Sequence, residues 1–244
     1  TPRHKYIFKL FFNEIYKINF EITNDIQGFQ EFEGVKLNYS NKKIDQELFI
    51  ESYGLIEEKG IDQQEINVKF ENEIPTFFQA QSDATMSFDV FSASFYLVSR
   101  YEEYLPFVKD VHQRFQAENA LAYKYDFLQK PVINIWAKIL IERIKQQYPN
   151  LEIVAPEYKF ISTIDIDNAF FYLEKGFVRS CAGFLRSIFT LDFAGAKQRI
   201  AVLLGKEQDP YDTYDMQLTL QKTNNLEVIY FILLADYGLN DKNI

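Results

Sequence analysis

The sequence predicts a two-domain α/β protein. An α+β domain over residues 1–155 precedes the first strands and helices of an incomplete β/α domain over residues 156–244. Three observations predict this arrangement. Short alternating segments between residues 18 and 80 give way to longer helical periods. Residues 149–157 contain two prolines and no helical period, which places the domain boundary there. Beyond it, two apolar, β-branched runs are separated by helical segments, which is typical of β/α layers.

The composition is that of a folded, acidic protein. The 244 residues are 47% hydrophobic and 17% aromatic, with a formal net charge of −9. This charge argues against nucleic acid and against an anionic membrane surface as the main partner, because both are polyanions. No apolar run approaches the roughly 20 residues needed to cross a bilayer. The single cysteine, Cys181, excludes an intramolecular disulfide and fits a reducing compartment, so a cytoplasmic location is favoured; we expect it to be a small buried hydrophobe.

Helices and strands of the first domain follow from the spacing of apolar residues. A helix is predicted over 3–16. Strands are predicted at 18–23, 35–39 and 48–56, with a turn at 41–43, and weaker strands at 66–70 and 76–80.

Two longer helices complete the predicted first domain. Phe88, Phe91 and Phe95 recur at helical steps and indicate a helix over 87–105, with Ser87 as its N-cap and the phenylalanines in the core. A second helix begins at Pro131 and ends before Pro149.

The second domain is predicted to begin and end with a strand. Buried parallel strands are expected at 158–167 and 226–238, with helices at 176–189, 193–204 and 212–223 between them. Two parallel strands cannot close a barrel, so this domain is expected to be an incomplete fragment. Its unpaired edge at 226–234 would be covered by a second copy of the chain, rearranged, or poorly ordered.

Candidate functional residues stand where the predicted strands end. Asp165 and Asp167 are two apart, so an extended strand directs both to the same face, and paired carboxylates suit a divalent cation and a general base. Asn168 follows directly, and Asp236 ends the second strand. The alternative is that Asp167 or Asn168 caps the following segment.

A second cluster, residues 209–215, holds three Asp and two Tyr before a helix. Tyr211 and Asp212 are candidate sugar-binding residues, although capping of the next helix by Asp212 or Thr213 is the favoured interpretation. In the first domain, His112 with Asp110 and Arg114 is interpreted as a solvated loop rather than a polar site.

Several of these segments resemble a known pair of domains. Residues 160–170 (FISTIDIDNAF), 203–215 and 228–238 resemble the opening of a bacterial polysaccharide deacetylase domain. Upstream, 37–40 (LNYS), 88–106, 114–124 and 127–137 resemble the uncharacterised companion domain that precedes it in proteins of the Bacteroidetes type. The resemblance covers essentially the whole chain.

The resemblance implies a metal-dependent hydrolase that removes N-acetyl or O-acetyl groups from a glycan. Asp165 would be the catalytic base, taking a proton from water on the metal, and Asp167 a ligand of zinc or a similar divalent metal. The family motif has adjacent aspartates followed by Gly, whereas Ile166 separates them here and Asn168 follows. The family's two metal-binding histidines are expected beyond Ile244, so residues 1–244 alone are expected to bind no metal and to be inactive.

Two other functions remain open from the sequence. The separated aspartates and the high aromatic content fit a non-catalytic glycan-binding or scaffolding module with a degenerate deacetylase domain. The D-x-D pattern of Asp165 and Asp167 also fits a nucleotide-sugar transferase or an aspartyl phosphatase, although scarce glycine argues against the transferase, and the phosphatase pattern usually has Thr or Val where Ala169 stands.

Overall fold

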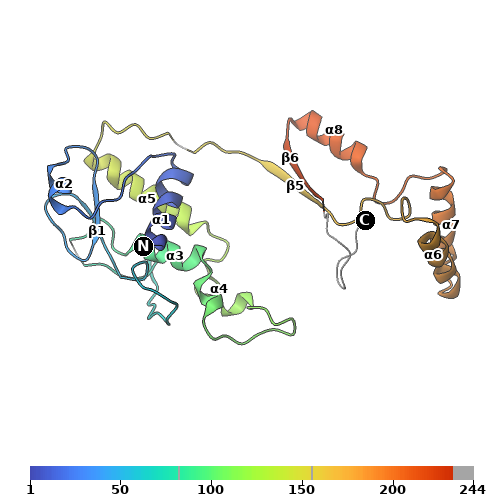
Figure 1. The fold of residues 1–244 in the computed structure, drawn as a ribbon, viewed down its shortest axis with the longest axis horizontal. Coiled ribbons are helices and arrows are strands. Elements are labelled where there is room, and N and C mark those ends of the chain that lie inside the picture. Colours follow the sequence, from blue (N-terminus) through green and yellow to red (C-terminus); the bar gives the residue numbers. More distant parts are fainter. Residues whose placement is uncertain (82, 155, 233–244) are drawn as a thin grey trace. The chain divides into compact units, whose positions relative to one another are not determined.

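The computed structural model describes residues 1–81, 83–154 and 156–232, and the chain divides into two compact units, Thr1–Pro156 and Glu157–Ile244 (Figure 1). As predicted, the protein is a mixed α/β structure. The described residues form three two-stranded sheets, and none of these closes into a barrel. In the same ranges, no helix has both the length and the apolar character that a membrane span requires.

The first unit contains most of the helices and two of the sheets. Its α-helices are α1 (Pro2–Phe8), α2 (Ile26–Glu31), α3 (Val90–Val98), α4 (Leu121–Lys124) and α5 (Val132–Gln147). A π-helix, η1 (Lys9–Ile15), continues α1, and 3-10 helices η2 (Tyr101–Tyr104) and η3 (Ala117–Asn119) lie between α3 and α4. Its strands are β1 (Leu37–Ser40), β2 (Leu48–Glu51), β3 (Lys69–Glu71) and β4 (Ile74–Thr76).

Strand predictions in the first unit are partly wrong. Residues 18–23 form no strand, because Ile18 and Phe20, on the same side of the alternating segment, pack against the core and the segment pairs with no other strand in the described residues. Strands β1 and β2 flank the predicted turn but pair in parallel, with Leu37 opposite Leu48. The weaker candidates shift, because the antiparallel pair β3–β4 turns at Asn72 and Glu73, both in the left-handed region.

The first long helix is shorter than predicted at both ends. Its N-cap is Asp89 rather than Ser87, because the Asp89 carboxylate accepts the N–H groups of Phe91 and Ser92. The helix ends at Val98, since Arg100 takes a left-handed conformation with φ of 53° and a 3-10 turn follows. Helix α5 begins at Val132, with Pro131 as its N-cap rather than its first residue, and it ends before Pro149 as predicted.

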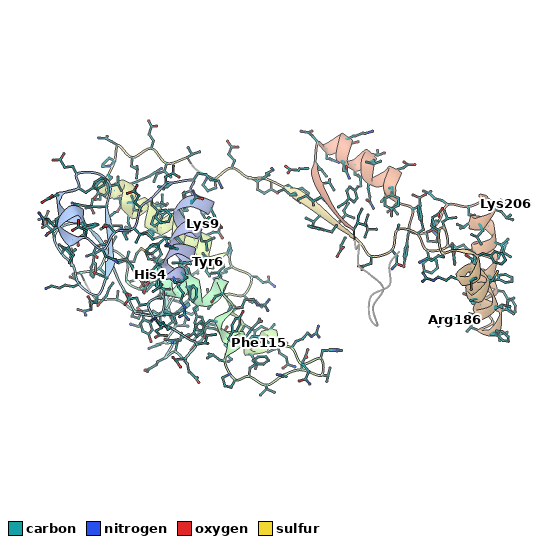
Figure 2. The ribbon with its side chains drawn as sticks, in the orientation of Figure 1. His4, Tyr6, Lys9, Phe115, Arg186 and Lys206 are labelled. Carbon is teal, nitrogen blue, oxygen red and sulfur yellow. The ribbon has the colours of Figure 1, made fainter. Side chains whose placement is uncertain are left out.

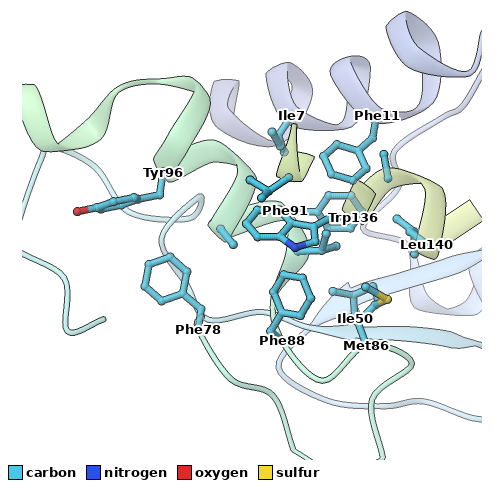
Figure 3. Close-up of a cluster of buried hydrophobic side chains, with 14 of the residues drawn as sticks. Ile7, Phe11, Ile50, Phe78, Met86, Phe88, Phe91, Tyr96, Trp136 and Leu140 are labelled. Carbon is cyan, nitrogen blue, oxygen red and sulfur yellow. The ribbon is translucent and has the colours of Figure 1, made fainter. Parts of the chain in front are cut away.

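The core of the first unit is aromatic (Figure 3). Ile7 of α1 and Phe11 of η1 pack with Phe91 of α3 and Trp136 of α5. The Trp136 indole is fully buried, and its Nε1 donates a hydrogen bond to the Pro75 carbonyl at 3.0 Å. Phe88 and Phe91 are therefore core residues, as predicted, whereas Phe95 is half-buried and packs against the edge of the core.

The second unit contains β5 (Ile161–Ile166), α6 (Phe177–Phe189), α7 (Phe193–Leu203), α8 (Tyr214–Asn224) and β6 (Glu227–Ile232). Strands β5 and β6 are parallel, as predicted, with Asp165 opposite Phe231. The prediction that they are buried is wrong for the described residues: both strands alternate between exposed and half-buried positions. One face of the pair is covered by α8, to which Tyr230 is tied by hydrogen bonds with Gln217 and Gln221.

Cys181 is a further correction, because it is exposed rather than buried. It lies on α6, in which no side chain is fully buried. The regularly spaced apolar residues of this helix therefore do not face a core.

Candidate functional site

Asp165 and Asp167 lie at the carboxyl end of β5. Asp165 belongs to the exposed face of the strand, together with Ile161 and Thr163, and opposite the face that α8 covers. Asp167 follows at a bend two residues later and is also exposed. Carboxyl ends of parallel strands are where β/α folds collect functional side chains, so this edge is the candidate site.

Asn168 begins the loop that leaves β5. It is exposed, and its Oδ1 accepts a long hydrogen bond of 3.4 Å from the Lys175 Nζ. The helix that follows, α6, has Gly176 as its N-cap and no side-chain cap. Neither Asp167 nor Asn168 therefore caps α6.

One carboxylate that the sequence analysis missed holds this loop in place. Asp209 is only 3% exposed, and its Oδ1 accepts the N–H groups of Phe171 and Tyr211 at 2.7 and 2.9 Å. Its Oδ2 accepts those of Tyr172 and Leu173 at 2.7 and 3.1 Å. Burial alone would raise the pKa of Asp209, but the four N–H donors outweigh it and lower the pKa below its ordinary value.

Two aromatic contacts reinforce the same loop. The Tyr214 hydroxyl donates to the Ala169 carbonyl at 2.8 Å. The Arg199 guanidinium lies over the ring of the buried Tyr172, 4.7 Å from its centroid. The loop between β5 and α6 is thus fastened to α7 and to the segment before α8, which fixes the backbone directly after Asp165 and Asp167. The Asp-Pro pair that opens residues 209–215 was the one sequence signal that marked Asp209 as a turn residue.

Tyr211 and Asp212 lie in the segment before α8, close to the fastened loop. Tyr211 is exposed and its ring meets that of Phe171 edge-on, with centroids 5.0 Å apart. Asp212 is half-buried and accepts, through its backbone carbonyl, a hydrogen bond from the Gln208 Nε2. The N-cap position of α8 is occupied by Thr213, whose side chain makes no capping hydrogen bond. Asp236 lies outside the described residues.

The side chains at this edge of the sheet carry the types of oxygen atom that bind divalent cations. Asp165 and Asp167 offer carboxylate oxygens, and Asn168 offers an amide oxygen, all of which zinc and similar metals accept. Two carboxylates are fewer than a closed site needs, and within residues 1–81, 83–154 and 156–232 no three His, Cys, Asp or Glu residues are grouped to hold a metal ion. Both histidines of the sequence belong to the first unit.

The first unit contains a buried polar network around Asp89. Its Oδ2 accepts hydrogen bonds from the Tyr39 hydroxyl at 2.9 Å and the Tyr53 N–H at 2.8 Å, while Oδ1 caps α3. Burial raises the pKa of Asp89, against the lowering effect of these donors, and burial also raises the pKa of Tyr39. Every contact of Asp89 is internal and its side chain is inaccessible, so this network joins α3 to β1 and the segment after β2 rather than binding a substrate.

Asp110, His112 and Arg114 form a solvated loop, as favoured from the sequence. The Asp110 carboxylate accepts the N–H groups of His112 and Arg114 at 2.8 Å, and pairs with the Arg114 side chain. The His112 ring is exposed, and no hydrogen bond from it is found in the described part of the chain.

Comparison with known proteins adds one finding. A family model described as "Family of unknown function (DUF7033)" matches residues 1–149. The match ends before β5 and therefore does not include the candidate site. No curated protein and no solved structure matches the chain.

Proposed function

The chain belongs to the family of unknown function DUF7033, and from the resemblance of residues 160–170, 203–215 and 228–238 to a polysaccharide deacetylase domain we propose that the segment after this family's domain is the opening of a metal-dependent glycan deacetylase domain. The parent protein would then hydrolyse acetyl groups on a carbohydrate. The first unit would serve as its companion domain.

One observation carries the proposal: an exposed Asp-x-Asp pair ends a strand that is paired in parallel with its neighbour. The face opposite Asp165 is covered by a helix, as in β/α layers. Asp209 holds the backbone that follows the pair through hydrogen bonds. This supports the interpretation that the pair belongs to an ordered functional site rather than to a solvated strand end without a function.

The two aspartates have different proposed roles. Asp167 would be a metal ligand, and the bound cation would polarise the acetyl carbonyl. Asp165 would act as general base and accept a proton from the attacking water. Asn168, Tyr211 and Asp212 would contact the sugar, and the exposed Tyr211 ring is suited to pack against a pyranose face.

The test is acetate release from acetylated chito-oligosaccharides and acetylated xylan by the chain in its natural full length, with Zn²⁺, Co²⁺ or Mn²⁺ present. We expect Asp165→Asn to abolish turnover while metal binding, measured by titration calorimetry, stays. Asp167→Ala should lose both. Asp215→Asn, at an exposed carboxylate in the first turn of α8, is the matched control and should change neither.

Other outcomes identify the competing functions. Sugar binding without acetate release in the unaltered protein would indicate a glycan-binding module with a degenerate site. Mn²⁺-dependent binding of a nucleotide sugar that is lost in Asp165→Asn would indicate a transferase. Either result would overturn the deacetylase proposal.

A further inference from the structure

Helix α6 exposes an apolar stripe to solvent. Val178, Leu185 and Phe189 recur at steps of seven and four residues, so they share one side of the helix. Their exposed fractions are 79%, 53% and 84%. Single exposed hydrophobics are ordinary, but a continuous stripe on one helix marks an interaction surface.

Helix α7 extends this apolar surface. Phe193, Ile200 and Leu204 are exposed along one side of α7 and its end, and a groove of about 500 Å³ runs between them and Phe184 and Ile188 of α6. The opposite side of α7 carries Arg199 and the buried Val202, and it packs toward Tyr172. The two helices, over residues 175–206, are called the α6–α7 hairpin below.

The hairpin is basic although the chain is acidic. Residues 175–206 carry six Lys or Arg and one acidic residue, Asp192, in a chain whose net charge is −9. Arg179 and Arg186 are seven residues apart, so they form one row on α6, next to the apolar stripe. Lys197 and Lys206 line the groove, and Figure 2 shows Arg186 and Lys206 on this hairpin.

The basic side chains of this hairpin are available for an external partner. Arg179, Arg186, Lys197 and Lys206 are exposed, and in the described ranges none of them forms an ion pair. The acidic majority of the chain lies elsewhere in the sequence. The four residues are dispersed in the sequence, and only the helices bring them onto one hairpin.

We propose that the α6–α7 hairpin docks on an anionic lipid surface, lying in the plane of the interface rather than crossing it. An apolar stripe bordered by Arg and Lys is the pattern of interfacial amphipathic helices, whose apolar side enters the headgroup–acyl boundary while the cations meet lipid phosphates. Charge complementarity selects this occupant. A second copy docked symmetrically through the same face would bring its basic rows against those of the first.

The single cysteine provides a direct readout. Cys181 is exposed on α6, so an environment-sensitive fluorophore attached there reports on this hairpin alone. We expect a blue shift and intensity gain with vesicles of phosphatidylcholine and phosphatidylglycerol, a much smaller change with phosphatidylcholine alone, and a loss of the signal in 0.5 M NaCl. Co-sedimentation of the unlabelled chain with the same vesicles measures the affinity.

Variants separate the two contributions to binding. R179E with R186E, and V178S with F189S, should each weaken vesicle binding at least tenfold. All four side chains are exposed, so helix content measured by circular dichroism should stay unchanged. Matched controls in the first unit are K42E with K145E for charge and V111S for apolar exposure, and these should bind as the unaltered chain does.

Three results would overturn the proposal. One is no association with anionic vesicles. Another is equal affinity of the hairpin and control variants. The third is concentration-dependent self-association that F189S abolishes in the absence of lipid binding, which would assign the face to a second copy.

Discussion

Replacing Asp209 by Asn tests whether one buried carboxylate organises the loop at the candidate site. Each carboxylate oxygen accepts two backbone N–H groups at 2.7–3.1 Å. The Asn side chain keeps one oxygen and turns the other position into an NH₂ donor that faces two donors. Two charge-assisted hydrogen bonds are therefore lost, and a buried donor without an acceptor costs about 1–3 kcal/mol.

The expected loss of stability is about 2–4 kcal/mol in the free energy of unfolding of the second unit. Tyr172 is buried, so its N–H group has no water to replace the lost acceptor. With a urea m-value of about 1–2 kcal/mol/M, the midpoint of urea unfolding should fall by about 1–4 M.

The assay uses the chain's only tryptophan to separate the units. Trp136 lies in the core of the first unit, so its fluorescence reports that unit, while far-ultraviolet circular dichroism reports both. Asp209→Asn should lower the midpoint of the dichroism transition of the second unit and leave the fluorescence midpoint unchanged. The control is Asp212→Asn, the same substitution three residues on. If both variants unfold alike, Asp209 does not hold the loop and the reasoning is refuted.

Three further outcomes are expected. Folding lowers the pKa of Asp209, so its contribution to stability is present above the ordinary value of 3.8 and is lost as the pH falls through the folded-state pKa. In urea titrations, the difference in unfolding free energy between the unaltered chain and Asp209→Asn should therefore shrink below about pH 4. A difference that stays constant with pH would contradict this. Asp89→Ala should destabilise the first unit by about 3–5 kcal/mol, measured by Trp fluorescence, because it removes a buried cap and leaves several donors without a partner. The exposed cap variant Asp25→Ala should cost about 1 kcal/mol, and equal losses would refute the role of burial. Trp136→Phe should cost about 1–3 kcal/mol by circular dichroism, since the Pro75 carbonyl loses its donor and the core loses volume, and an unchanged midpoint would show that the hydrogen bond contributes nothing.

Helices were the best-predicted elements, because an apolar period of 3.6 residues and proline or glycine at the ends are local signals. Helix α5 between Pro131 and Pro149, and helices α6 and α7, follow the predicted ranges closely. The position of the Asp-x-Asp pair at the end of β5 was also predictable from the sequence, because side chains two residues apart in a strand lie on the same face.

Contacts between residues distant in sequence could not be predicted from local sequence patterns. Residues 18–23 alternate like a strand, but Ile18 and Phe20 pack on the core. Ser87 is a residue type suited to an N-cap, but it is Asp89 whose carboxylate accepts the N–H groups at the start of α3. The role of Asp209 depends on N–H groups 36–38 residues earlier, which no spacing rule connects.

The sequence by itself determined the mixed α/β class, the principal helices and the position of the aspartate pair, because these depend on side-chain period and residue type within a few turns or strand positions. Only the tertiary structure decided which faces are covered. The apolar period of α6 is the same whether the helix is buried or exposed, and it is the packing of the described unit that leaves Val178 and Phe189 in solvent. It also gathers Arg179, Arg186 and Lys206 onto one hairpin of an acidic chain, since helix geometry and packing, rather than adjacency in sequence, set the local charge.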